Sequence, residues 1–223
     1  MSLLGLRLRR WLQARRTALP DIIRTLWASP LPAKSSYLKD VCFLVCDAEM
    51  SGLDPRQAEL LSLGWVRIEG LEICLGSAAH QLIRNARSVG QSATIHQLRD
   101  CELDTADDLQ AALNAFLQAA AGCVLVFHNA ALDRAFLDRA SKAVFGGPLL
   151  LPSIDTLLLE QQLLQRHERA IAQGDLRLGA CRERYSLQAH TAHNALADAL
   201  ATAELLLAHI AKRGPGLRLR DLL

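Results

Sequence analysis

The stretch from Val41 to Pro55, VCFLVCDAEMSGLDP, constrains the fold of this chain more than any other. It opens with six apolar residues rich in β-formers, and an unbroken apolar run of this kind predicts a strand buried on both faces of a sheet. The run leads directly to Asp47 and Glu49. Because residues i and i+2 of a strand point to the same side, the two carboxylates face one place, where their repulsion favours a bound cation or an added proton.

Length and composition fit one globular domain with much helix. The chain has 223 residues, of which 51% are hydrophobic and 4% aromatic, which is enough for one full core. No apolar run without charge reaches the length of a membrane span. The cysteines form no CxxC pair and no zinc-like spacing, so we expect free thiols in a reducing, cytoplasmic compartment rather than a disulfide scaffold. These cysteines are Cys42, Cys46, Cys74, Cys101, Cys123 and Cys181.

The net charge of +2 is unevenly distributed along the chain. Residues 1–40 hold eight of the 25 Lys and Arg residues and two of the 23 Asp and Glu residues, so the remainder carries a net charge of −4. A body of that charge is unsuited to gripping a long duplex through many phosphate contacts. It can hold a short strand if metal ions offset its acids.

Residues 1–40 are predicted to form a basic helical arm. An apolar stripe at helical spacing, interrupted by Arg15, consists of Leu4, Leu8, Trp11 and Leu12. A second short helix is expected from Asp21 to Trp27, and the following Pro-rich segment predicts a linker. We expect the arm to pack on its own domain. Binding of a protein partner, of an acidic membrane surface or of nucleic acid, and an Arg-rich targeting role, are the alternatives.

The rest of the chain predicts a mixed sheet covered by helices, which is an α/β fold. Strands are expected at Val41–Cys46, Leu60–Ile68, Leu71–Leu75 (resuming near His80–Ile83) and Cys123–Phe127. Helices are expected at Thr105–Ala121, Ala130–Phe145, Ile154–Gln173, Leu176–Tyr185 and His193–Lys212. Thr105 suits the N-cap of the first helix, and glycines end most of the others. The early strands form an antiparallel meander, and the later ones alternate with helices.

A second group of polar residues follows the predicted strand that ends at Phe127. His128 and Asn129 stand at the strand tip, where sites in such sheets commonly gather. Asp133 is one turn into the next helix, and Phe136 is three residues further, on the same helix face. Taken singly, His128 and Asn129 are better explained as turn residues, and Asp133 as a surface acid, than as parts of a site.

A third group is His193 and Asp198, which are five residues apart. On a straight helix this spacing does not place both on one face. They can share a site if His193 lies at the start of the helix or in the loop before it. Asp198 is also an unusual acid, because it stands within an apolar helical sequence. The nearby His190 has no acid at the same spacing and is expected at the surface.

Together these segments resemble the DEDDh branch of the DnaQ-like 3′→5′ exonucleases, which includes the proofreading subunit of DNA polymerase III. The motifs are D-A-E at 47–49 followed by S-G-L, H-N at 128–129 with an acid at 133, and H-x-A-L-x-D-A at 193–199. Ile95-His96 resembles a further family segment whose histidine lies near the substrate. The resemblance implies a ribonuclease H-like fold, with an exonuclease domain at 41–213 and a short tail at 214–223.

The resemblance also implies the roles of individual residues. Two divalent ions, Mg²⁺ or Mn²⁺, would be held by Asp47, Glu49, Asp133 and Asp198, since hard cations prefer oxygen ligands. His193 would be the general base, a task suited to an imidazole near neutral pH. Leu53 would wedge between the last two bases of the strand. The full set of expected substrate-binding residues is Met50, Ser51, Gly52, Leu53, His96, His128, Asn129 and Phe136.

The expected activity is removal of nucleoside 5′-monophosphates from the 3′ end of single-stranded nucleic acid, with DNA favoured over RNA. The segment at 49–53 also resembles oligoribonucleases, which trim short RNA, although the His-Asn pair is typical of the proofreading-type branch. Two further alternatives are a catalytically silent nucleic-acid-binding or regulatory module and a two-metal phosphoesterase for small nucleotides. The sequence does not determine the oligomeric state or the role of the arm.

Overall fold

A mixed sheet forms the centre of the molecule in this computed structural model, which describes residues 3–16, 19–84 and 107–223. Within these residues the strands are β1 (Phe43–Met50), β2 (Leu60–Glu69), β3 (Glu72–Leu82), β4 (Val124–Phe127) and β5 (Ser153–Asp155), in the order β3-β2-β1-β4-β5. The first three form an antiparallel meander, whereas β4 and β5 run parallel to β1. The predicted mixed α/β architecture is therefore confirmed.

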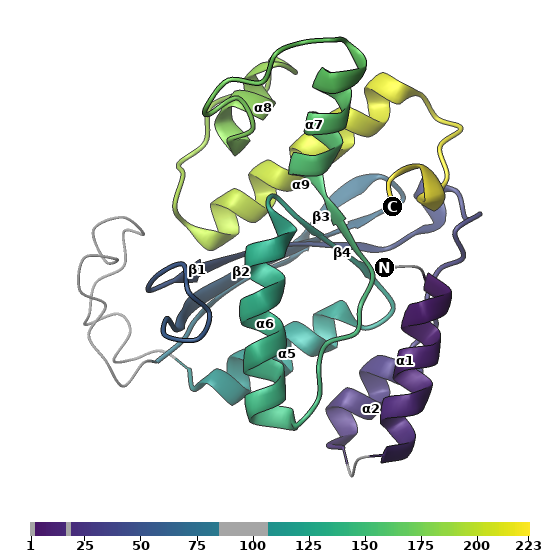
Figure 1. Cartoon of the computed structure of the whole chain (residues 1–223), viewed down its shortest axis with the longest axis vertical. Helices are drawn as coiled ribbons and strands as arrows, with labels where there is room; N and C mark the ends of the chain where they lie inside the picture. Colours follow the sequence, from purple (N-terminus) through teal and green to yellow (C-terminus); the bar gives the residue numbers. More distant parts are fainter. Residues whose placement is uncertain (1–2, 17–18, 85–106) are drawn as a thin grey trace.

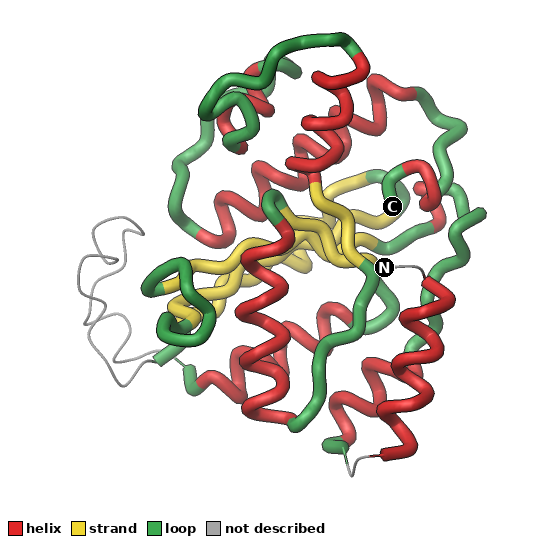
Figure 2. The backbone as a smooth tube through the Cα atoms, viewed as in Figure 1, coloured by secondary structure: helices red, strands yellow, loops and turns green. Residues whose placement is uncertain are grey.

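Helices cover both faces of the sheet (Figures 1 and 2). One face carries α7 (Thr156–Arg166), α8 (Leu178–Glu183) and the long α9 (Ala195–Arg213), which crosses β1 and β2. The other face carries α5 (Leu109–Ala120) and α6 (Ala130–Phe145). Short 3₁₀ turns lie at Leu38–Asp40 and Leu219–Asp221. No helix in the described ranges is both long enough and apolar enough to span a bilayer.

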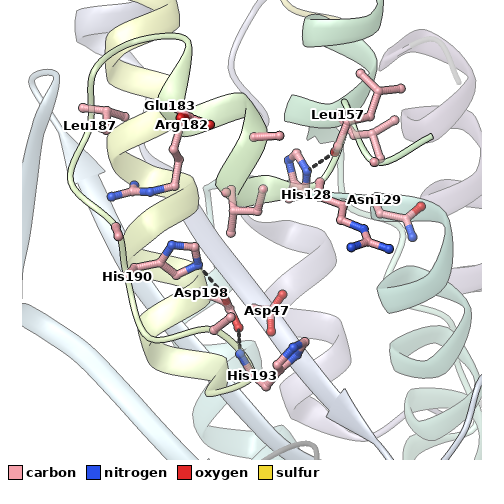
Figure 3. Close-up of a pocket in the computed structure, with 18 of the residues that line it drawn as sticks. Asp47, His128, Asn129, Leu157, Arg182, Glu183, Leu187, His190, His193 and Asp198 are labelled. Atoms are coloured by element: carbon pink, nitrogen blue, oxygen red, sulfur yellow. Dashed lines mark hydrogen bonds and ion pairs between the residues drawn. The ribbon is translucent and has the colours of Figure 1, made fainter. Parts of the chain in front are cut away.

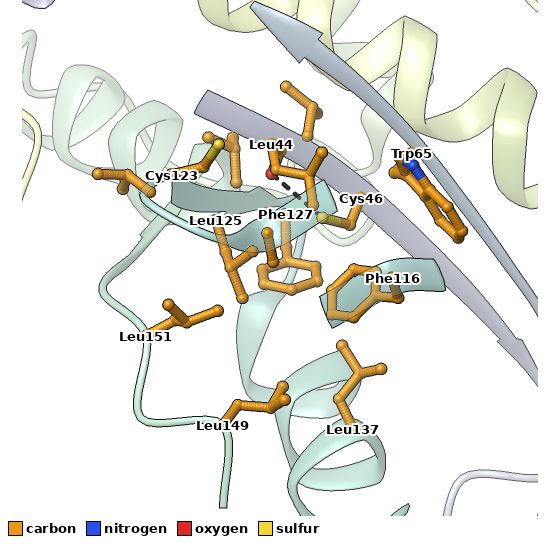
Figure 4. Close-up of a cluster of buried hydrophobic side chains, with 14 of the residues drawn as sticks. Leu44, Cys46, Trp65, Phe116, Cys123, Leu125, Phe127, Leu137, Leu149 and Leu151 are labelled. Carbon is orange, nitrogen blue, oxygen red and sulfur yellow. Dashed lines mark hydrogen bonds between the residues drawn. The ribbon is translucent and has the colours of Figure 1, made fainter. Parts of the chain in front are cut away.

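The central position of β1 explains its apolar sequence. Phe43, Leu44 and Val45 have no solvent exposure, because helices cover both faces of the strand. On the α5 and α6 side, apolar side chains from several elements meet in one cluster (Figure 4). There the rings of Trp65 and Phe116 pack edge to face with their centroids 5.7 Å apart. This packing holds β1 in place at the residues just before its acids.

The N-terminal arm packs on the domain, as its sequence predicts. Its helices are α1 (Leu3–Arg16) and α2 (Asp21–Ala28), and α2 lies against α5. Ile23, Leu26 and Trp27 are buried, and Nε1 of Trp27 donates to the carbonyl of Leu149 at 3.2 Å. Residues 214–223, expected to be a tail, are also docked: the N–H of Leu219 donates to the carbonyl of Ser36 at 3.0 Å.

Of the helices predicted in the domain, only Ala130–Phe145 has the expected bounds. The helices expected at Leu176–Tyr185 and His193–Lys212 are found at Leu178–Glu183 and Ala195–Arg213. The helix expected at Ile154–Gln173 begins only at Thr156 and ends at Arg166, because Ser153–Asp155 is extended and pairs with β4. Asp155 then caps α7 by accepting a hydrogen bond from the N–H of Leu157 at 3.0 Å. In α5 the cap is Asp108, which accepts from the N–H of Ala111 at 2.7 Å. The expected cap, Thr105, lies outside the described residues.

Cys42 and Cys123 form a disulfide, so the expectation of free thiols is wrong for this pair. Both cysteines immediately precede strands that lie side by side, since Phe43 of β1 pairs with Val124 of β4. Their Cα atoms are 4.8 Å apart although 81 residues separate them in the sequence. Cys46, Cys74 and Cys181 are free, as predicted. Cys101 lies outside the described residues.

Candidate active site

Asp47 and Glu49 extend past the end of the neighbouring strand. β4 pairs with β1 only as far as Val45, whereas β2 continues beside β1 and places Gly64 opposite Asp47. The two carboxylates therefore lie where one side of β1 is no longer covered by a strand. Both point to the same side, as the period of a strand requires. This end of the sheet is where the predicted site residues come together.

Gly64 lets the start of α9 lie directly on the sheet. A Cβ at this position would overlap the backbone of Ala195 and Leu196. Asn194 begins the helix by accepting a hydrogen bond from the N–H of Ala197 at 3.1 Å. Asp198 follows in the first turn. The missing side chain at Gly64 thus allows an acid on α9 to reach the acids on β1.

Asp47, Glu49 and Asp198 form a compact carboxylate cluster. Each offers one oxygen, and these oxygens all lie within 4.8 Å of one another. Burial raises the pKa of Asp47 well above its usual value, and the charges of Asp133, Asp198 and Glu49 raise it further. Acids crowded in this way fit the donor set of a hard divalent cation, which would offset their repulsion.

Asp133 approaches the same cluster from α6. Its Oδ1 accepts a hydrogen bond from the N–H of Ala48 at 3.1 Å, and its side chain is buried. Burial raises the pKa of Asp133 to about 7, although the hydrogen bond from Ala48 acts in the opposite direction. Its charge is among those that raise the pKa of Asp47. Asp133 is therefore coupled to the cluster but lies outside the group of three close oxygens.

His193 lies in the loop before α9, where it can share a site with Asp198. Its φ of 67° is in the left-handed region, which is uncommon for residues other than glycine. In this conformation its backbone N–H donates to Oδ2 of Asp198 at 2.8 Å. Its side chain is exposed and lines the groove described below, near Asp47 (Figure 3).

The surface position expected for His190 is wrong. Its side chain is only 15% exposed, and its Nε2 lies 2.8 Å from Oδ1 of Asp198. The loop before α9 therefore brings two histidines to the same carboxylate (Figure 3). The spacing rule for helices could not show this contact, because His190 lies in the loop and not on the helix.

A groove of about 1840 Å³ leads away from the cluster. Asp47, Asp198 and His193 line one end of it, and α8 with the loops on either side of it lines much of the rest. Arg182 fixes one of these loops: it is buried, and its guanidinium donates to the carbonyls of Ala201 and Gln188 at 2.6 and 2.8 Å.

His128 and Asn129 line the groove, but His128 is held by the protein itself. Its Nδ1 lies 2.8 Å from Oγ1 of Thr156, and its Nε2 lies 2.8 Å from the carbonyl of Leu176. Burial lowers the pKa of His128, and because a carbonyl can only accept, Nε2 is the donor to Leu176. Both nitrogens thus have partners within the protein, so any contact of His128 with a ligand in the groove would be made by the ring rather than by a free nitrogen.

The segment after β1 contributes one strongly exposed side chain. Leu53 is 81% exposed and lines the groove, whereas Met50 is buried. The hydroxyl of Ser51 accepts a hydrogen bond from the N–H of Glu59 at 2.9 Å, which closes the turn. A Cβ at Gly52 would lie 3.3 Å from that of Ala58, so the turn is tightly packed. These contacts present Leu53 to the groove.

Phe136 does not line the groove. It is 2% exposed and belongs to the hydrophobic core, so the expectation that it contacts substrate is wrong. The helical spacing from Asp133 correctly indicates proximity but does not distinguish an inward from an outward direction. His96 lies outside the described residues.

The sequence matches the family model of an exonuclease, RNase_T, over residues 44–206. The chain belongs to this exonuclease family. The match begins within β1 and ends within α9. It therefore spans all five carboxylate and histidine positions that were predicted to be catalytic.

Curated relatives of this exonuclease include a DNA polymerase III PolC-type and a DNA polymerase III subunit epsilon-like protein. It is 32% identical over 173 residues to a DNA polymerase III PolC-type of Thermotoga maritima, covering 77% of this chain and 12% of the relative. It is 30% identical over 173 residues to a DNA polymerase III subunit epsilon-like protein of Rhodobacter capsulatus, covering 76% of this chain and 24% of the relative. The exonuclease thus spans a quarter or less of the length of these relatives.

Solved structures share the fold. The exonuclease superposes on E. coli exonuclease I in complex with a 5cy-dT13 oligonucleotide with a TM-score of 0.66 and 15% identity, covering 82% of this chain and 42% of that chain. It superposes on cell-death related nuclease 4 with a TM-score of 0.65 and 14% identity, covering 77% of this chain and 64% of that chain.

Two residues that shape the site of this exonuclease were missed at the level of sequence. Gly64 stands inside an apolar strand, and a glycine at such a place indicates a close backbone approach. That signal was present in the segment from Leu60 to Ile68. For His190 the available signal was weaker: it is a second histidine in the short segment that precedes His193.

Proposed function

We propose that this chain is a metal-dependent 3′→5′ exonuclease that removes nucleoside 5′-monophosphates from the 3′ end of single-stranded nucleic acid. The observation that carries the proposal is the cluster of Asp47, Glu49 and Asp198 at the end of a groove, with one oxygen of each within 4.8 Å of the others. Membership of the exonuclease family supports the same chemistry.

The residues present fit a pair of divalent ions, Mg²⁺ or Mn²⁺. The raised pKa values of Asp47 and Asp133 reflect crowded, buried acids, which a cation would relieve. Asp47, Glu49 and Asp198 would hold one ion, while Asp47 and Asp133 would hold the second. When bound, such ions stabilise charge on the phosphate and lower the pKa of an attacking water.

The protein's own groups then position the substrate and move the proton. His193 would accept the proton of the attacking water at a ring nitrogen, since its side chain reaches the groove beside Asp198. The hydrogen bond from its backbone N–H to Oδ2 of Asp198 holds the main chain of His193 beside that acid. Leu53 would contact the terminal base, and Asn129 would line the adjoining part of the groove.

DNA is the favoured substrate of the proposal. Relatives of this chain are DNA polymerase III proteins, and a structural neighbour is exonuclease I with a deoxythymidine oligonucleotide. A small site with few aromatic side chains is expected to show little sequence preference.

A degradation assay tests the proposal. The purified chain is incubated with single strands of DNA and RNA of several lengths, labelled at either end, with Mg²⁺, with Mn²⁺ or with a chelator. We expect metal-dependent release of mononucleotides from the 3′ end, which Asp198→Asn abolishes. Activity confined to RNA of a few nucleotides would instead indicate oligoribonuclease-like trimming. Binding of strands without cleavage under every condition would indicate a silent module and overturn the proposal.

A further inference from the structure

The outer face of α1 is apolar and exposed. The stripe that the sequence predicts is directed away from the protein, with exposed fractions of 79% at Leu4, 56% at Leu8, 50% at Trp11 and 41% at Leu12. The guanidinium of Arg15 lies over the Trp11 ring, 3.8 Å from its centroid. Four large apolar side chains along one side of a short helix form a patch of the kind that a binding partner covers.

The opposite face of the same helix holds it to the domain. Leu3 and Leu6 are buried in the core. Arg10 is also buried, and it donates to the carbonyl of Leu150 at 2.9 Å and to those of Trp27 and Ser29 at 3.3 and 3.2 Å. Because both faces carry apolar residues and only one is used, rotation of α1 cannot bury the stripe without exposing Leu3 and Leu6.

The charge of α1 restricts what can cover the stripe. Residues 3–16 contain five arginines and no acid, so a basic surface is excluded by repulsion. Helices with an apolar stripe flanked by cationic side chains, and with a tryptophan in the stripe, bind in the plane of anionic lipid surfaces. The juxtaposed leucines make this chemistry a better fit than a nucleic-acid strand, which would need exposed stacking platforms rather than aliphatic side chains.

A groove beside the stripe provides a place for an anionic group. It has a volume of about 690 Å³, lies between α1 and α2, and is lined by Arg7, Arg10 and Arg24 together with Trp11 and Trp27. Within the described part of the chain, Nη2 of Arg10 is buried and has no hydrogen-bond partner, and no carboxylate pairs with these arginines. Arg10 already donates to three carbonyls and its Nη2 is closed to solvent, so an anionic group in the groove would meet the exposed Arg7 and Arg24 instead.

We propose that α1 docks this exonuclease on an anionic lipid surface, with the leucine stripe in the interface and a lipid phosphate in the groove beside Arg7 and Arg24. The arm and the α6 and α9 ends that form the active site lie on different sides of the molecule (Figure 1). Docking through α1 would therefore leave the catalytic groove open. This proposal is independent of the catalytic assignment.

Vesicle binding tests the proposal. The full chain is sedimented with vesicles of phosphatidylcholine alone or of equal parts phosphatidylcholine and phosphatidylglycerol, and tryptophan fluorescence is recorded in parallel. We expect binding only to the anionic vesicles, with a blue shift from Trp11 and with weakening at high salt. The pair Leu8→Ser and Leu12→Ser should lower the partition coefficient by about tenfold or more.

The matched control is the pair Leu75→Ser and Leu158→Ser, which removes leucines of similar exposure from β3 and α7 and should bind like wild type. Absence of binding to anionic vesicles, or equal loss in the two pairs of variants, would overturn the proposal. Light scattering adds a further arm. If the stripe variants convert a dimer to a monomer, the stripe contacts a second copy of the chain and the lipid proposal is wrong.

Discussion

Nε2 of His190 lies 2.8 Å from Oδ1 of Asp198, while the backbone N–H of His193 donates to the other oxygen of the same carboxylate. The loop before α9 therefore fixes both oxygens of an acid that belongs to the three-carboxylate cluster. A carboxylate held in one orientation loses less entropy when it binds a cation, and partners that orient ligands are typically worth 10–100-fold in metal affinity.

His190→Ala should therefore weaken metal binding more than it weakens the fold. We expect the Mn²⁺ concentration for half-maximal activity to rise by roughly 10–100-fold, with kcat at saturating metal changed much less. Calorimetric titration of Mn²⁺ provides a readout that is independent of turnover. His190→Gln, which keeps a donor, should restore part of the affinity. An unchanged metal dependence in the alanine variant would show that the contact has no part in orienting Asp198.

His193→Asn should abolish most of the turnover and leave the structure intact. Asn tolerates the left-handed conformation found at this position, and the backbone hydrogen bond to Asp198 does not depend on the side chain. Loss of the general base is expected to lower kcat by about 10²–10⁴-fold. Thermal unfolding and Mn²⁺ titration should be close to wild type. Near-normal turnover would refute the role assigned to His193.

Asp133→Asn should stabilise the metal-free protein above neutral pH while abolishing activity. The pKa of Asp133 is about 7 in the folded protein against 3.8 for the unperturbed group, so the native state binds the proton more tightly than the unfolded chain does. The contribution of this group to stability is therefore largest at low pH and falls as the pH rises from about 4 to 7, by on the order of 4 kcal/mol. Asn has no such titration and still accepts the hydrogen bond from Ala48.

Chemical denaturation at pH 5.5 and pH 8 without metal measures this effect. Wild type should be less stable at pH 8, whereas the Asn variant should show a smaller difference. Saturating Mg²⁺ or Mn²⁺ should raise the melting temperature of wild type at pH 8 by binding the native state alone. Asp138→Asn, on the same helix, is a control that should not flatten the pH dependence. Equal pH profiles for wild type and Asp133→Asn would contradict the coupling of the acids.

Thr156→Val should loosen the wall of the groove at His128. The substitution keeps the shape but removes the hydroxyl that contacts both Nδ1 of His128 and the carbonyl of Phe127. A buried ring nitrogen left without a partner costs roughly 1–3 kcal/mol. We expect that loss in free energy of unfolding and a higher KM with little change in kcat. Thr156→Ser, which keeps the hydroxyl, should behave like wild type on both measures.

Much of the fold could be predicted because its signals are local. The helix at Ala130–Phe145 is found with its expected bounds, since a glycine pair and a proline follow it. The strand β5 was missed because three residues give no period, and only pairing with β4 keeps them extended. The disulfide between Cys42 and Cys123 was missed because it depends on strand register, which separates neighbours in space by 81 residues in sequence.

The parts of the site that could be predicted are those whose motifs are short runs of neighbouring residues in the sequence. Asp47, Glu49 and Asp198 meet as proposed, because each motif sits at the end of an element that the sequence defines well. The direction of a side chain on its helix was less accessible: Phe136 is buried, and the leucine stripe of α1 is exposed rather than packed. Both depend on which neighbours the tertiary fold supplies.

The missing side chain at Gly64 shows that two properties are separate in proteins of this architecture. One is the presence of the catalytic residues, and the other is their assembly into one site. A methyl group there would push the backbone at Ala195 away from the strands, while the paired acids of β1 would stay where they are. Such a chain would keep every catalytic residue of its motifs and still lack a functional active site. When members of this family are sorted into active and inactive ones by sequence, the residue at this position should be considered together with the catalytic acids, although it takes no part in the chemistry.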